Sequence, residues 1–149
     1  MPKAATRVPA AHARSGVIID TGVLVALYRR DDPRHGDVAR WFAGFDAAML
    51  TVEAVLTESA YFMPARSRAA LARLAASGRL QLHRPDAAGH ARMADLFGKY
   101  EDQDPDWADL ALVWLAEATG IARIATLDIA DFSVYRINGR KRFELELLR

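Results

Sequence analysis

Short apolar runs alternate with longer amphipathic stretches along this chain, and this rhythm predicts strands that alternate with helices. We expect strands at residues 17–20, 47–50, 80–83, 121–126 and 134–137. We expect helices at residues 21–30, from 33 to 45, from 53 to 63, and at 67–77, 87–100 and 106–119. Strands that alternate with helices in this way are typical of an α/β fold around a mostly parallel central sheet.

Several residues mark where these elements begin, end or turn. Thr51 is a candidate N-cap for the helix that follows it, because threonine accepts hydrogen bonds from helix N–H groups. Asp131 and Phe132 read as a turn, and Asn138-Gly139 is a strong signal for a hairpin. We expect residues 143–148 to form the partner strand of that hairpin.

Length and composition indicate one globular domain. The chain has 149 residues, of which 52% are hydrophobic and 26% charged, and no apolar run is long enough to span a membrane. We expect a frayed N-terminal extension over residues 1–16 and a single domain over residues 17–149. The chain has no cysteine, which excludes disulfides and thiolate metal sites and fits the cytoplasm.

Four acidic residues stand where the chain should be most apolar. Asp20 and Asp128 each end an apolar strand-like run, Glu58 interrupts an apolar helix, and Asp109 lies on the apolar side of another. A carboxylate beside buried surface costs several kcal/mol unless it is paired or bound to a cation. The four acids therefore suggest one shared site for a hard metal ion.

The expected fold brings these acids to the same edge. Ligand sites of open α/β sheets lie beyond the carboxyl ends of the strands, which is where Asp20 and Asp128 stand. Asp106 and Asp109 are three residues apart and share a helix face. Carboxylates without nearby histidine or cysteine favour Mg²⁺ or Mn²⁺ over zinc. Taken singly, each acid also has a structural explanation, as an N-cap, a turn residue, an arginine partner or a helix-dipole charge.

Four segments of the chain together resemble the PIN-domain nucleases, and within them the VapC-like toxins of bacterial type II toxin–antitoxin systems. The segments are Ile18-Ile19-Asp20-Thr21, Leu50-Thr51 followed by Glu58, Asp106-Trp107-Ala108-Asp109, and Thr126-Leu127-Asp128-Ile129-Ala130-Asp131-Phe132. Their order and spacing carry the resemblance, which spans roughly residues 17–148. One departure is Gly22, where many relatives have asparagine.

The resemblance implies an endoribonuclease that depends on Mg²⁺, or alternatively Mn²⁺, and hydrolyses RNA phosphodiester bonds. It also implies a homodimer and a cognate antitoxin protein. Catalytic residues carried over from the family are Asp20, Glu58, Asp109 and Asp128, and the implied metal ligands are these four together with Asp106. Thr21 and Thr126 are candidates to hydrogen-bond a ligand, a water or a carboxylate, and Asp131 is either a supporting acid or a turn residue.

Two further interpretations and two further features stay open at this level. PIN domains also serve in RNA processing outside toxin systems, and some are catalytically silent binding modules. Trp107 lies between two of the acids and either stacks a base or packs in the core. The basic run 140–142 either contacts RNA phosphates or guards an exposed hairpin edge.

Overall fold

A five-stranded sheet forms the centre of the protein. The structure is a computed structural model, and it describes residues 16–146. The strand order is β3-β2-β1-β4-β7, and every pairing within this sheet is parallel. The predicted α/β fold with a mostly parallel sheet is therefore confirmed.

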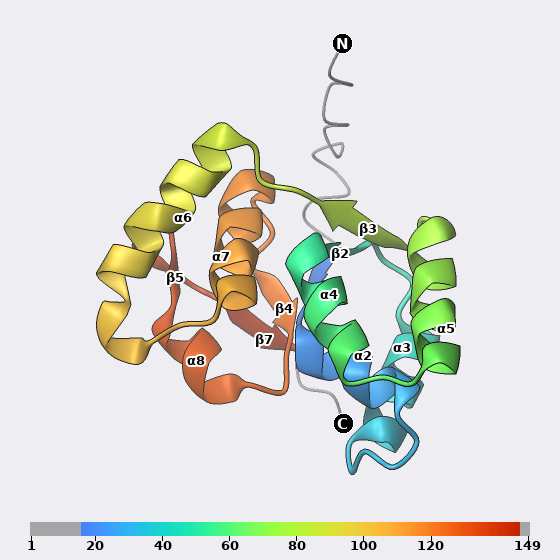
Figure 1. The fold of residues 1–149 in the computed structure, drawn as a ribbon. Helices are drawn as coiled ribbons and strands as arrows, with labels where there is room; N and C mark the ends of the chain where they lie inside the picture. The colour runs from blue at the N-terminus through green and yellow to red at the C-terminus, as the bar shows by residue number, and fades with distance from the viewer. Residues whose placement is uncertain (1–15, 147–149) are drawn as a thin grey trace.

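Helices connect the strands in the order shown in Figure 1. The strands of the sheet are β1 (Val17–Ile19), β2 (Met49–Val52), β3 (Leu80–His83), β4 (Arg123–Ala125) and β7 (Glu144–Glu146). The helices are α2 (Thr21–Tyr28), α3 (His35–Gly44), α4 (Glu53–Tyr61), α5 (Ala65–Ala76), α6 (Ala87–Lys99), α7 (Trp107–Thr119) and α8 (Ile129–Val134). A short 3-10 helix, η1 (Glu101–Gln103), precedes α7. Helices α4 and α7 contact one another and stand side by side in Figure 1.

Strand β1 lies in the middle of the sheet, between β2 and β4. All residues of β1 and β2 are buried, as expected for strands of a parallel sheet covered on both faces. Directly after β1, the backbone N–H of Asp20 donates to the carbonyl of Ala125 at 3.1 Å. This bond holds the chain just beyond β1 against the end of β4, so the two carboxyl ends are neighbours.

Helix α7 is the most deeply buried helix of the protein. Its residues from Ala108 to Val113 are all buried, which explains why an amphipathic pattern is weak in this segment. The helix ends at Gly120, whose φ of 76° is the left-handed conformation that glycine adopts readily at helix C-termini. An ion pair between Arg92 and Glu117, with 2.7 Å between Nε and Oε1, fastens α7 to α6.

The prediction that Thr51 caps a helix is wrong. Thr51 lies within β2 and is fully buried, and its hydroxyl donates to the carbonyl of Ile19 in β1 at 2.7 Å. The N-cap position of α4 is instead Val52, which offers no side-chain hydrogen bond. A buried hydroxyl must find a partner, and the neighbouring strand supplies one.

The predicted turn at Asp131 and Phe132 is also wrong, because both residues lie in α8. Asp128 occupies the N-cap position and accepts a hydrogen bond from the backbone N–H of Asp131 at 3.1 Å. The Phe132 side chain is buried, with its ring centroid 5.4 Å from that of Phe143. Capping and burial together explain a helix of six residues where a turn was expected.

The predicted hairpin forms, but with a different partner strand. Strand β5 (Arg136–Ile137) pairs in antiparallel fashion with β6 (Lys141–Arg142). Asn138 and Gly139 between them have positive φ angles of 52° and 72°, as a tight hairpin turn requires. The segment expected to be the partner contributes β7 instead, which joins the main sheet parallel to β4.

Two expectations concern the ends of the chain and the membrane. The expected extension over residues 1–16 falls almost wholly on residues 1–15, which lie outside the described residues. Within residues 16–146, no helix is long and apolar enough to cross a bilayer.

Candidate metal centre

Asp20 is a buried carboxylate at the carboxyl end of the central strand. It is 6% exposed and caps α2 by accepting from the backbone N–H of Thr21 at 2.7 Å. Its second oxygen accepts from the hydroxyl of Thr126, also at 2.7 Å. Burial raises the pKa of Asp20 from 3.8 to about 6; the two hydrogen bonds oppose this rise, and the charges of Asp128 and Glu58 add to it.

Asp109 is the second buried carboxylate, in the first turn of α7. It is 8% exposed, and the hydroxyl of Tyr135 donates to its Oδ2 at 3.2 Å. Burial, followed by the charge of Asp20, raises the pKa of Asp109 from 3.8 to about 7. Both carboxylates therefore hold their charge at a cost, which a bound cation would relieve.

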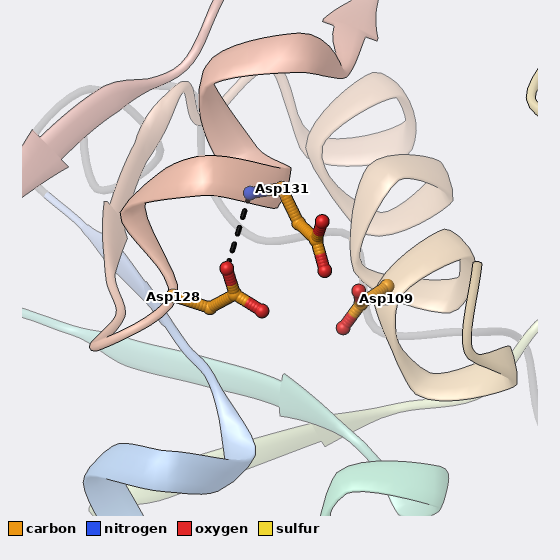
Figure 2. Close-up of side chains that lie close together, drawn as sticks. All are labelled: Asp109, Asp128 and Asp131. Atoms are coloured by element: carbon orange, nitrogen blue, oxygen red, sulfur yellow. Dashed lines mark hydrogen bonds between the residues drawn. The ribbon is translucent and has the colours of Figure 1, made fainter. Parts of the chain in front are cut away.

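Asp109, Asp128 and Asp131 bring carboxylate oxygens together at the edge of the sheet. One oxygen from each lies within 4.8 Å of the others, and Figure 2 shows the three side chains directed toward a common space. Asp128 is exposed and Asp131 is partly buried. Burial and the neighbouring Asp128 raise the pKa of Asp131.

Thr126 connects Asp20 to Asp128 through hydrogen bonds. Its hydroxyl donates to Asp20 and accepts from the backbone N–H of Asp128 at 2.9 Å. The hydroxyl of Thr21 donates to Glu58 Oε2 at 3.3 Å. Both threonines therefore hydrogen-bond carboxylates of the site, which is one of the roles expected for them.

Glu58 and Asp106 border the same site. Glu58 comes from the partly buried side of α4, and its charge contributes to the raised pKa of Asp20. Asp106 is exposed at the N-cap position of α7 without a side-chain capping bond, and its charge contributes to the raised pKa of Asp109. All five acids singled out in the sequence thus lie around the carboxyl edge of the sheet.

The closest group of ligand atoms differs from the predicted set in its members. Asp131 belongs to it, whereas the predicted ligands Asp20, Glu58 and Asp106 do not. The sequence left Asp131 open between a supporting acid and a turn residue, and the structure brings its carboxylate into this group. The available signal was Asp128 followed three residues later by another acid, a spacing that favours a helix N-terminus and directs both side chains to one end of α8.

No ion pair neutralises these acids within residues 16–146. The ion pairs in this part of the chain use other carboxylates, namely Asp31, Asp37, Glu117 and Glu146. Buried carboxylates without a cationic partner fit a site for a divalent cation. A donor set made only of oxygens suits hard ions such as Mg²⁺ and Mn²⁺.

Comparisons with known proteins show what this chain is similar to. The family model described as PIN domain matches residues 17–137. Ribonuclease VapC26 of Mycobacterium tuberculosis (strain ATCC 25618 / H37Rv) is 32% identical over 131 residues, which cover 85% of this chain and 97% of the relative. The crystal structure of Mycobacterium tuberculosis VapC20, a sarcin-ricin loop cleaving toxin, shares the fold with a TM-score of 0.66 at 19% identity, over 72% of this chain and 86% of that one.

Proposed function

This chain belongs to the PIN-domain family, and on that premise we propose that it is a VapC-type endoribonuclease, the toxin of a toxin–antitoxin pair. The observation that carries the proposal is the pair of buried carboxylates, Asp20 and Asp109, among further acids at the carboxyl edge of the sheet. The similarity of the chain to a ribonuclease, over nearly the full length of that relative, supports the same conclusion.

The acids would hold the cation, and two hydroxyl groups orient them. Asp20, Asp109 and Asp128 are the proposed holders of Mg²⁺, with Mn²⁺ as the alternative ion, and Glu58, Asp106 and Asp131 complete the oxygen donors around them. When bound, a divalent cation supplies Lewis-acid stabilisation of charge that develops on a phosphate. The hydrogen bonds from Thr126 and Tyr135 fix the orientation of Asp20 and Asp109 before substrate arrives.

The proposed reaction is hydrolysis of an RNA phosphodiester bond by in-line attack of water on phosphorus. The P–O3′ bond breaks, which leaves a 3′-hydroxyl and a 5′-phosphate and requires no covalent protein intermediate. Carboxylates of Asp20, Glu58, Asp109 and Asp128 would orient the water, and one of them would accept its proton. The departing O3′ would take up a proton from solvent.

The remaining parts of the proposal concern partners. We expect RNA as substrate, a cognate antitoxin protein as inhibitor, a homodimer as the assembled form, and the cytoplasm as the place of action. Residues 17–149 would act as one PIN domain. Co-purification with the product of a short neighbouring reading frame, and loss of RNA cleavage in that complex, tests the toxin assignment directly.

Cleavage assays test the chemistry. The full chain should cut single-stranded RNA in the presence of Mg²⁺ or Mn²⁺, and EDTA should stop the reaction. Asp109→Asn should lower the rate of cleavage by roughly a thousandfold or more, because it removes a negative charge that would hold the cation. Asp46→Asn, which changes an exposed acid on the loop before β2, is the matched control and should cut normally. Cleavage that survives EDTA or the Asp109→Asn substitution would refute the proposal.

A further inference from the structure

An open groove lies beside the acidic site, between the first two turns of α4 and the start of α7. Its volume is about 550 Å³, and it is lined by Glu53, Ala54, Thr57, Glu58, Asp106, Trp107 and Ala108. Glu58 and Asp106 belong both to this groove and to the border of the metal site. A molecule whose reacting group lies at the acids would therefore extend naturally into the groove.

Trp107 gives the groove a large exposed aromatic surface. It is 58% exposed, although most large apolar residues within 16–146 are buried or partly buried. Phe97 and His90 of α6 pack beside it, with ring centroids 5.7 Å and 6.3 Å from the indole. These ring contacts favour the observed orientation of the indole.

The charge of the groove decides which part of an RNA it can accept. Three of the lining residues are acids, and the lining contains no lysine or arginine within residues 16–146. Phosphate groups would be repelled by such walls. A nucleobase is uncharged, offers a flat face for stacking, and carries N–H groups that carboxylates accept.

We propose that this groove binds a nucleobase next to the scissile phosphate, stacked on Trp107, with its hydrogen-bond donors directed to the acidic walls. The inference rests on the proposed ribonuclease function and deepens it by naming how the substrate is read. Trp107 then contacts the substrate base, and the carboxylate that meets the base edge determines which base is preferred.

Guanine fits these walls best. Its N1–H and N2–H₂ groups form a donor pair that matches the two oxygens of one carboxylate. Glu58 already accepts from Thr21 and Asp106 is a proposed oxygen donor at the metal site, whereas Glu53 is exposed and belongs to the groove alone. Glu53 is therefore the carboxylate assigned to the base edge.

Binding measurements without cleavage test the stacking contact. In the cleavage-deficient Asp20→Asn background, affinity for a uridine octamer with one central guanosine is measured with and without Trp107→Ala. The substitution should weaken binding by about 5- to 100-fold. Trp107→Phe should retain most of the affinity, and Tyr61→Ala, which removes an aromatic side chain that is 79% exposed outside the groove, should retain all of it.

The salt dependence separates stacking from phosphate contacts. Trp107→Ala removes no charge, so the slope of log affinity against log salt should stay unchanged while the affinity falls. Replacing the guanosine by inosine, which lacks the exocyclic amino group, should weaken binding by about tenfold in the parent and far less in Glu53→Gln. No difference between guanosine and inosine would overturn the assignment of the base edge.

Further outcomes distinguish this inference from the proposed function. If the wild-type chain cuts RNA and Trp107→Ala cuts it with unchanged KM, the groove inference is overturned while the nuclease proposal stands. If no RNA is cut but binding still depends on Trp107, the groove inference stands and the nuclease proposal fails. A change of oligomeric state in Trp107→Ala with unchanged RNA affinity would show a protein interface instead, and would also overturn the inference.

Discussion

Replacing Asp20 by asparagine should stabilise the metal-free protein while it abolishes RNA cleavage. The folded-state pKa of Asp20 is raised from 3.8 to about 6, so between these pH values the folded chain binds more protons than the unfolded chain. Stability then falls as pH rises through this window, and the full penalty is present above pH 6. The asparagine side chain carries no charge at any pH, and the Asp20→Asn variant therefore escapes the penalty.

The size of the effect follows from the pKa difference. A difference of about 2 corresponds to roughly 3 kcal/mol at most, because Asp20 is almost completely buried and little screened by solvent. The amide must still be desolvated and exchanges its bond with Thr126, so a net gain of about 1–3 kcal/mol at pH 8 is expected. For a domain of this size the melting temperature should rise by roughly 3–8 °C.

Thermal and urea unfolding in EDTA at pH 4 and pH 8 measures this gain. The Asp20→Asn variant should exceed wild type at pH 8 and approach it at pH 4, while Asp46→Asn should match wild type at both. Adding Mg²⁺ should stabilise the wild-type chain much more than Asp20→Asn, since binding to the folded state raises its stability by mass action.

One result would refute the reasoning. If Asp20→Asn were less stable than wild type at pH 8 in EDTA, or if the difference were the same at both pH values, Asp20 would not be a buried, uncompensated charge. The raised pKa of Asp20 would then no longer indicate a cation site.

The other predictions concern the residues that surround the site and the packing of the helices. Tyr135→Phe should keep the ring packing but remove the donor to Asp109, so the Mg²⁺ concentration needed for half-maximal cleavage should rise about tenfold; an unchanged Mg²⁺ titration would contradict this role. Gly89→Ala should destabilise the fold by about 1–3 kcal/mol in urea unfolding, because a Cβ there would lie 2.7 Å from Trp114 Nε1. Gly22→Ala should instead stabilise by about 0.5–1 kcal/mol, since its nearest neighbour would be 3.7 Å away and alanine favours the helix; equal effects at the two glycines would contradict the packing argument.

The sequence predicted the features that depend on local pattern. Buried strands that alternate with helices were enough for the parallel α/β sheet, and the position of Asp20 after a strand placed it at the carboxyl edge. The same reasoning placed Asp109 inside the fold because its neighbours in the helix are apolar. The catalytic and metal-binding roles of these residues stay predictions.

Features that depend on contacts between distant segments could not be predicted in the same way. The hydrogen bond from Tyr135 to Asp109 joins residues 26 apart in sequence, and nothing near Tyr135 in the chain indicates it. Residues 144–146 pair with the side of β4 that faces away from β1, and an ion pair between Arg123 and Glu146 stabilises that pairing. Strand pairing of this kind depends on the packing of the whole sheet and not on the local sequence.

The bond between Thr126 and Asp20 spans 106 positions of the chain. A ribosome that makes this protein releases the first acid early and the threonine that orients it only near the end of synthesis. Fragments left by premature termination before β4 would lack both that strand and the two acids of the site that follow it, Asp128 and Asp131. Only a nearly finished polypeptide can therefore bring Asp20, Thr126 and Asp128 together.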